Sequence, residues 1–443
     1  MQILLIHPLF CAQYPDSSIH WKAHLDLLAS VGGNYLRGSM SSRDRQSDET
    51  DYFHDDNLYP FHRDANTGLY DMERFNDEYW QRFRNFLDMT VERDIIVQIE
   101  IWDRHDFGAD RGPYPAKGWS EQPYNPVNNI NYTSEESGFP EVRTTSTHSF
   151  FRTTPDLENN TLVLQYQEAY VEKLLSISLE YGHVLYCISN ETHESEHWSG
   201  YWANLIRVRA EEAGREVEIT EMWGPVDLMD PKHRNTFDRP DLYSFAEISQ
   251  HNHQEEGQIH WDNMQQARQL LADPPRPMNN VKIYGGERFG GGLEGGIEKF
   301  WRNIIGGSAS ARFHRPGAVE GYYGAGLGLP AQTNIRSMRM FTEEFNIFVA
   351  EPDNNLLMDR GENEAYCAAT PSEQYAVYFT DGGAVQLDLR ETEGEFRLRW
   401  LNILESVWAG ESVVNGGEYI DLTAPGEGQW VAVVLAYYLA SKG

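Results

Sequence analysis

The sequence predicts an α/β protein with an eight-fold β/α (TIM) barrel over residues 1–350, followed by a small antiparallel β-sandwich domain over residues 351–443. Two observations support the barrel. Short apolar segments alternate with longer amphipathic ones, as in repeated strand–helix units. The short segments are mostly apolar throughout, which is typical of strands buried on both faces of a parallel sheet. Beyond residue 350 the pattern changes to closely spaced strand-like segments separated by Gly-rich turns, which predicts the sandwich.

The predicted barrel strands are rich in Val, Ile, Tyr and Phe. Patterns with apolar residues three or four apart predict the helices between them, and several of these patterns end at Gly. A doubly wound open sheet is the weaker alternative, because no Gly-rich phosphate turn follows an early strand. We expect strands at 3–9, 34–40, 95–102, 183–189, 217–220, 242–249, 281–286 and 308–314, and helices at 20–32, 75–94, 167–182, 202–214, 263–273, 296–307 and 336–350.

Two long segments, 41–74 and 103–166, follow predicted strands and are rich in polar and aromatic residues. Insertions of this length are commonly functional, and we expect them to wall a cleft at the strand ends. The sandwich strands are expected at 374–380, 384–390, 395–402, 417–423 and 429–437.

The charge balance is strongly acidic, with 68 Asp and Glu against 36 Lys and Arg and a formal net charge of −32. Such a surface repels nucleic-acid phosphates and anionic membranes, so neither is an expected partner. No apolar run approaches the roughly 20 residues of a membrane helix. Three distant cysteines, Cys11, Cys187 and Cys367, form no disulfide framework.

The first ten residues have neither a basic region nor a small-residue cleavage site, so they do not resemble a signal peptide. A cytoplasmic protein and the mature form of a secreted or periplasmic protein both fit this observation. No cofactor is expected.

Polar and aromatic residues gather at the predicted carboxyl ends of the barrel strands, where active sites of such barrels lie. Aromatic faces together with charged and amide groups are the mix that binds sugars. The candidate substrate-binding residues are Arg37, Trp102, Asp103, Asn190, His193, Trp223, His251, His253, Arg312 and His314.

Two carboxylates, Glu191 and Glu287, follow the fourth and seventh predicted strands, which lie across the barrel from each other. Cleavage of a glycosidic bond needs one acid to protonate the leaving oxygen and one carboxylate facing the anomeric carbon. A separation of about 5–5.5 Å predicts retention of configuration, and about 6.5–9.5 Å predicts inversion. These two residues are therefore the candidate catalytic pair.

The segment AYVEKLLSISLEYGHVLYCISNETH, within residues 167–193, resembles the fourth-strand region of clan A glycoside hydrolases, where Asn-Glu follows the strand. Residues 68–103, 123–131 and 400–435 resemble a group of these barrels that carries a carboxyl-terminal module named collagen-binding. The resemblance spans most of the chain and implies a retaining glycoside hydrolase. The expected substrate is a plant or algal polysaccharide or an oligosaccharide derived from it.

The resemblance also implies roles for individual residues. Glu191 would be the general acid/base, and Glu287 the nucleophile, with Glu294 and Glu221 as alternatives. Asn190 would bond the 2-hydroxyl of the sugar. Arg37 would keep the nucleophile ionised, and His251 or His253 would support the nucleophile or touch the sugar.

Several of these residues have a second interpretation. Trp102 and Trp223 fit a hydrophobic core as well as a sugar platform, and Arg37 fits a plain buried ion pair. His251 and His253 form an HxH pattern, but no third zinc ligand stands at a clear spacing, so no metal site is expected.

Arg312 belongs to a basic group with Arg288 and Arg315. These arginines could bind a carboxylate or sulfate on an acidic sugar, but pairing with the acids of the site is the preferred interpretation. For the whole protein, the alternative to an enzyme is a catalytically inactive carbohydrate-binding or adhesion protein.

Overall fold

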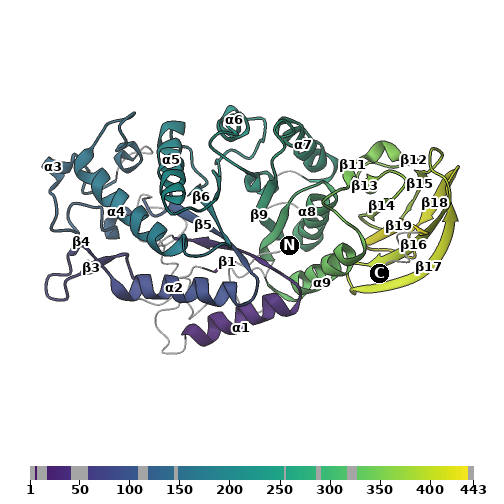
Figure 1. Cartoon of the computed structure of the whole chain (residues 1–443), viewed down its shortest axis with the longest axis horizontal. Helices are drawn as coiled ribbons and strands as arrows, with labels where there is room; N and C mark the ends of the chain where they lie inside the picture. The colour runs from purple at the N-terminus through teal and green to yellow at the C-terminus, as the bar shows by residue number, and fades with distance from the viewer. Residues whose placement is uncertain are drawn as a thin grey trace.

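The computed structural model places a helical, parallel-stranded part at one end of the chain's long axis and a β-sandwich at the other (Figure 1). Helices α2, α4 and α5 lie along the first group of strands, and α7, α8 and α9 lie toward the sandwich. The structure describes residues 5–6, 17–40, 58–107, 118–143, 148–253, 256–285, 291–316 and 327–437.

The parallel strands form two sheets. Strands β2, β5 and β6 are almost entirely buried, as their apolar sequences predict. The first sheet has the order β1 (Leu5–Ile6), β2 (Tyr35–Ser39), β5 (Ile96–Asp103), β6 (Val184–Asn190) and β7 (Glu218–Thr220). The second sheet has the order β8 (Ala246–Glu247), β9 (Met278–Gly285) and β10 (Ser310–Pro316).

A buried polar layer joins the two sheets. The Tyr35 hydroxyl donates to Gln98 Oε1 at 2.6 Å, and Gln98 Nε2 donates to Glu247 Oε2 at 3.2 Å. Asn279 Nδ2 donates to the Tyr35 hydroxyl at 2.7 Å. Strands β2 and β5 therefore face β8 and β9 across a shared interior. Within the described residues the two sheets do not join into one closed sheet, so the closed barrel stays a prediction.

The helices alternate with these strands, as predicted, but most begin several residues earlier than expected. Polar caps explain two of the earlier starts, because Asn160 accepts from Val163 N and Ser195 accepts from His197 N. The helices are α1 (Ser17–Ser30), α2 (Asp77–Val91), α3 (Ser134–Ser137), α4 (Thr161–Ser178), α5 (Glu196–Glu212), α6 (Pro231–Phe237), α7 (Gly257–Leu270), α8 (Gly292–Ile305) and α9 (Leu329–Glu344).

The two long insertions contain ordered structure in their described parts. A small antiparallel pair, β3 (Phe61–Arg63) and β4 (Tyr70–Phe75), lies in the first. The second is packed by aromatic rings, with Phe107 and Phe150 stacked at 3.7 Å between centroids. The expectation that these segments wall a cleft stays a prediction.

The carboxyl-terminal strands form a two-layer antiparallel sandwich, as predicted. Along each strand, successive side chains point to opposite faces of the sheet, because the side-chain period of a β-strand is two residues. The larger sheet has the order β11 (Glu351–Pro352), β13 (Ala365–Thr370), β14 (Gln374–Phe379), β19 (Trp430–Ala436), β16 (Glu395–Asn402) and β17 (Val407–Asn415), and the smaller has β12 (Leu357–Met358), β15 (Ala384–Asp388) and β18 (Tyr419–Thr423).

The outer face of the larger sheet packs on the helical part. Trp301 of α8 stacks on Tyr378 of β14 at 6.1 Å, and Trp261 of α7 packs on Tyr366 of β13 at 4.7 Å. Tyr366 and Tyr378 belong to the same core cluster as the helices of the parallel-stranded part. The central strands of this sheet are thus buried on both faces, which explains the uninterrupted apolar sequence of β19.

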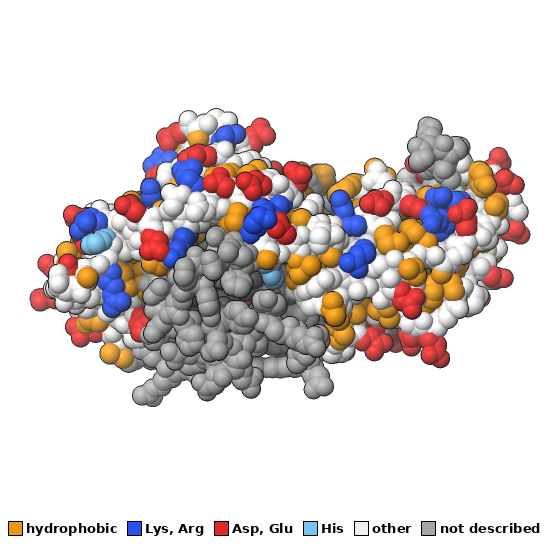
Figure 2. Space-filling view, turned by 90° about the horizontal axis from the view of Figure 1, so that it is seen from below, with side chains coloured by type: hydrophobic (Ala, Val, Ile, Leu, Met, Phe, Trp, Pro, Cys, Tyr) orange, Lys and Arg blue, Asp and Glu red, His pale blue; other side chains and the backbone are white. Residues whose placement is uncertain are grey.

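The face shown in Figure 2 carries acidic side chains over both halves, with Lys and Arg side chains between them. In the described part of the chain, none of the helices combines the length and the apolar character that crossing a bilayer requires.

We expect Trp301→Ala to lower the free energy of unfolding by about 3–5 kcal/mol, because it removes a fully buried ring at the junction of the two parts. Urea unfolding followed by tryptophan fluorescence and circular dichroism measures this. Val413→Ala, at an exposed position of β17, is the control and should change stability by less than about 0.5 kcal/mol. Equal stability of the two variants would contradict the junction described here.

Candidate functional site

Glu191 lies directly after β6, at the carboxyl edge of the first sheet. Its φ is 54°, in the left-handed region that residues with a side chain seldom adopt. Backbone bonds on the next residue hold this conformation: Thr192 N donates to Met222 O at 2.9 Å, and Gly224 N donates to Thr192 O at 2.8 Å. The Glu191 side chain is 14% exposed. The turn therefore directs a mostly buried carboxylate to the strand ends.

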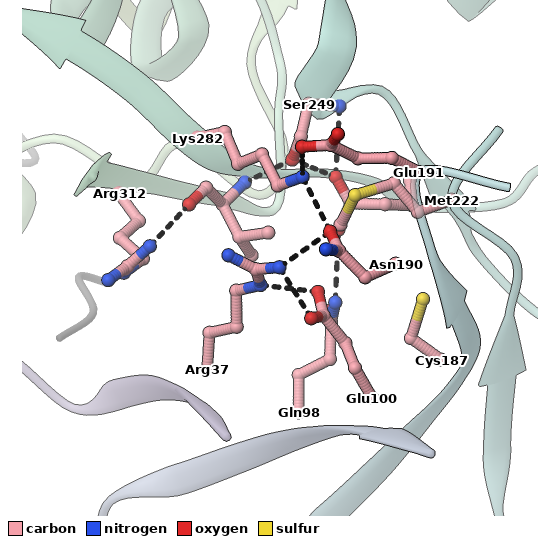
Figure 3. A network of polar contacts seen from close by, with 12 residues as sticks. Arg37, Gln98, Glu100, Cys187, Asn190, Glu191, Met222, Ser249, Lys282 and Arg312 are labelled. Atoms are coloured by element: carbon pink, nitrogen blue, oxygen red, sulfur yellow. Dashed lines mark hydrogen bonds and ion pairs between the residues drawn. The ribbon is translucent and has the colours of Figure 1, made fainter. Parts of the chain in front are cut away.

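Three cationic or potentially cationic side chains contact this carboxylate. Lys282 reaches across from β9 to Glu191 Oε1 (Figure 3). Arg104 Nη2 lies 3.1 Å and His105 Nε2 lies 3.2 Å from the other oxygen, Oε2. Both of these residues follow β5, so Glu191 is held from two neighbouring segments of the fold at once.

The charges around Glu191 decide its protonation. Burial raises its pKa, but the positive charge of Lys282 and the contacts of His105 and Arg104 outweigh burial and hold the pKa well below its usual range. Burial in turn lowers the pKa of Lys282 to about 8, although Glu191 partly offsets this. At neutral pH the free protein therefore holds Glu191 as a carboxylate.

Arg37 and Asn190 form the layer beneath. Arg37 makes a two-pronged ion pair with Glu100 of β5, and its Nη2 also donates to Asn190 Oδ1 at 2.8 Å. Lys282 Nζ donates to the same Oδ1 at 2.7 Å. Because both partners are donors, Oδ1 is fixed toward them and Nδ2 points elsewhere. The interpretation of Arg37 as a buried ion-pair residue is confirmed, with Glu100 as its partner.

Two further carboxyls are buried near these strand ends. Burial raises the pKa of Glu221, after β7, and of Glu247, in β8, to about 7 each. Glu221 accepts from Ser189 N and from Met222 N at 2.8 and 2.9 Å. Oε1 is thus occupied by two backbone N–H groups and Oε2 by the Ser199 hydroxyl, which makes Glu221 a poorer candidate nucleophile than its position in the sequence suggested.

For Trp102 and Trp223, the structure gives contacts that bear on the choice between a sugar platform and a core position. Trp102 packs against Tyr170 at 5.0 Å and Trp202 at 5.3 Å, and only 4% of it is exposed. Trp223 is equally buried and donates to Thr236 Oγ1. Both rings turn toward the surrounding helices, and their core interpretation is the one that burial favours.

The contacts of His251 are with His260 of α7. It is buried, its ring stacks on His260 at 4.5 Å, and its Nε2 lies 2.8 Å from the backbone oxygen of His260. Burial lowers its pKa to about 4, so it is a neutral ring that packs η3 (Ser249–His253) on α7. The expectation that it supports the site directly is not supported by these contacts.

Three other candidates lie around the strand ends. Asp103 is buried and accepts from His105 N at 3.0 Å, which fixes the turn that carries Arg104 and His105. His193 is exposed and rests on Gly224, where an added Cβ would meet the His193 ring at 2.3 Å. Arg312 is buried and donates to Val281 O at 2.7 Å.

Other candidates lie outside the described residues. These are Glu287 and Arg288, together with the side chains of His253, His314 and Arg315. The catalytic pair as a whole is therefore untested. Glu294, an alternative nucleophile, lies in the first turn of α8 and lines a hollow between α7, α8 and the sandwich residues Glu362 and Asn363.

The sequence interpretation missed the role of Lys282 and of Glu100. Each is a single charged residue inside an apolar strand, in VKIYG and IVQIEIW. Because charged residues are almost never fully buried without a partner, such an interruption signals an ion pair. The partner itself was not readable from the sequence. No group of His, Cys, Asp and Glu able to hold a metal is found in the described ranges.

Comparisons with known proteins give one family and several solved structures. The model of a family described as "Domain of unknown function (DUF6298)" matches residues 62–270. No curated protein matches the chain. A glycoside hydrolase family 5 structure from Bacteroides vulgatus is 14% identical with a TM-score of 0.62, covering 99% of this chain and 90% of its own.

Two further structures are similar. A family 39 glycoside hydrolase from Bacteroides cellulosilyticus is 10% identical with a TM-score of 0.54, covering 98% of this chain and 80% of its own. A maltogenic α-amylase from Thermotoga neapolitana is 9% identical with a TM-score of 0.53, covering 99% of each chain. At these identities the likeness shows a shared fold alone. The family match ends at residue 270, so the likeness of the sandwich to a collagen-binding module stays a prediction.

We expect Glu247→Gln to change the pH dependence of stability. A buried carboxyl with a raised pKa stabilises the fold when protonated, and this contribution is lost as pH rises from about 4.5 to about 7. A neutral Gln avoids the loss, so the variant should gain about 3 kcal/mol relative to the wild type between pH 4.5 and pH 8.

Urea denaturation at both pH values measures this difference. Glu218→Gln, at an exposed position of β7, is the control and should give the same difference from wild type at each pH. A pH-independent effect of Glu247→Gln would show that Glu247 is ionised in the folded protein.

Proposed function

We propose that this protein is a retaining glycoside hydrolase that acts on a plant or algal polysaccharide or oligosaccharide. The observation that carries the proposal is the position of Glu191 and Asn190. They lie side by side at the carboxyl end of β6, next to a buried Arg37–Glu100 pair. The fold shared with glycoside hydrolases of families 5 and 39 supports this proposal.

In the proposed mechanism Glu191 is the general acid/base. It first protonates the glycosidic oxygen while the second carboxylate, Glu287, bonds to the anomeric carbon and the glycosidic C–O bond breaks. Glu191, now ionised, then takes a proton from the water that hydrolyses the glycosyl-enzyme. The low pKa of Glu191 in the free protein suits this second half of the cycle.

Asn190 is the proposed ligand of the sugar 2-hydroxyl. Arg37 and Lys282 hold its oxygen at 2.8 and 2.7 Å, so the amide cannot flip without placing its NH₂ group against two donors. The orientation of Nδ2 is therefore set before substrate binds, which is the preorganisation that transition-state hydrogen bonds require.

We expect Glu191→Gln to lower kcat/KM by about 10²–10⁴, the usual contribution of a general acid/base. Hydrolysis of aryl glycosides and of plant and algal polysaccharides measures this. Glu196→Gln, at an exposed position in the first turn of α5, is the control and should keep wild-type activity. Equal activity of the two variants would rule out the role of Glu191. No hydrolysis by the wild type of any substrate would favour the binding-protein alternative.

We expect Lys282→Met to move the basic limb of the pH profile of kcat/KM to higher pH. Without the lysine charge, burial acts on Glu191 with less opposition and its pKa rises, so the acid form persists to higher pH. The arginines and histidines on the neighbouring segments are unchanged in the variant: Arg37, Arg104, His105 and His193. Lys282→Arg keeps the charge and is the control. A basic limb at the same pH in both variants would exclude electrostatic control by Lys282.

A further inference from the structure

The two oxygens of Glu191 have different surroundings. Oε1 contacts Lys282, whose side chain is 1% exposed and fixed on β9. Oε2 contacts Arg104 and His105, whose side chains are 33% and 36% exposed and lie beyond the end of β5. The first contact belongs to the interior, and the second lies on the side that solvent reaches.

Oε2, on the side of the more exposed partners, is the oxygen that a general acid would use toward a substrate. In the free protein it accepts from Arg104 and lies 3.2 Å from His105. A carboxylate oxygen that keeps a guanidinium bound is held ionised and cannot carry the proton that the leaving oxygen needs. The first half of the proposed reaction therefore requires that Arg104 and His105 leave Oε2.

The charged side chains around Glu191 indicate what kind of group would draw Arg104 and His105 away from Oε2. The chain has a net charge of −32, yet basic side chains surround this one carboxylate from several segments. Arg37 is already paired with Glu100, but Lys282 and Arg104 share the single charge of Glu191. Arg104 Nε makes no hydrogen bond to the described residues, so its guanidinium has donor capacity beyond Glu191. An anionic group of a ligand would be a suitable acceptor for these donors.

We propose that the sugar bound at this site carries an anionic substituent, the carboxylate of a uronic acid or a sulfate ester, which binds Arg104 and His105 and draws them from Glu191 Oε2. This inference rests on the proposed function and names its substrate class. The planar guanidinium of Arg104 suits two-pronged binding of either group. Once Oε2 is released, Glu191 takes a proton from solvent and donates it to the glycosidic oxygen.

The activity test uses three matched oligosaccharides with the same linkage: one with a uronate, its carboxyl-reduced neutral counterpart, and a sulfated form of the neutral sugar. The wild type should cleave one of the anionic substrates with a kcat/KM at least about tenfold above the neutral one, the effect of about 1.4 kcal/mol of selective binding. Which anionic arm is preferred distinguishes carboxylate from sulfate.

Arg104→Gln should bring this ratio close to one, while Arg84→Gln, a surface arginine of α2 paired with Glu180, should leave it unchanged. Arg104→Lys keeps the charge without the planar fork and should give an intermediate ratio. Cleavage of the neutral substrate as fast as both anionic ones would overturn the inference while leaving the hydrolase proposal intact.

A binding measurement separates the two proposals. Calorimetric titration of the wild type with D-glucuronate, D-galacturonate and sulfated D-galactose should show tighter binding than D-glucose and D-galactose, with the difference lost in Arg104→Gln. This result without hydrolysis of any substrate would support the anionic ligand and reject the hydrolase. Equal binding of neutral and anionic sugars to the wild type would overturn the inference whatever the activity.

Discussion

Buried charges tie the carboxyl ends of four strands together. Arg37 of β2 is paired with Glu100 of β5, Lys282 of β9 is paired with Glu191 after β6, and Asn190 accepts from both cations. Removing one partner of a buried pair costs about 3–5 kcal/mol, because an uncompensated charge remains. A one-residue slip of any of these strands would leave such a charge behind. The network therefore fixes the register of the strands and the geometry of the site together.

The rest of the fold supports this network from two sides. Below it, the polar layer of Tyr35, Gln98, Glu247 and Asn279 connects the two parallel sheets. Behind β9 and β10, helices α7, α8 and α9 pack on the larger sheet of the sandwich. Trp301 of α8 contacts both Phe341 of α9 and Tyr378 of β14. The sandwich thus braces the helix that covers β9, the strand that delivers Lys282.

Much of this arrangement could be predicted from the periodicity of apolar residues along the chain and from the polar residues that interrupt it. The strand–helix order, the sandwich, and the position of Asn190 and Glu191 at a strand end follow from local sequence. The partners of Glu191 do not, because Arg104 and Lys282 lie 87 and 91 residues away along the chain. Without knowledge of these partners, the sequence could not predict that Glu191 is held as a carboxylate. For Trp102 the sequence left a core position and a sugar platform open, because the side-chain direction of a residue near a strand end depends on the exact end of that strand.

The backbone at Glu191 has an evolutionary consequence. A residue with a side chain in the left-handed region costs of order 1 kcal/mol or more, a cost that Gly would avoid. Selection for folding alone would therefore favour the loss of this glutamate, and relatives freed from any chemical task should drift toward Gly or Asn at this position. If relatives nevertheless retain a glutamate at this position, an alignment would indicate that it has a chemical function before any assay is done.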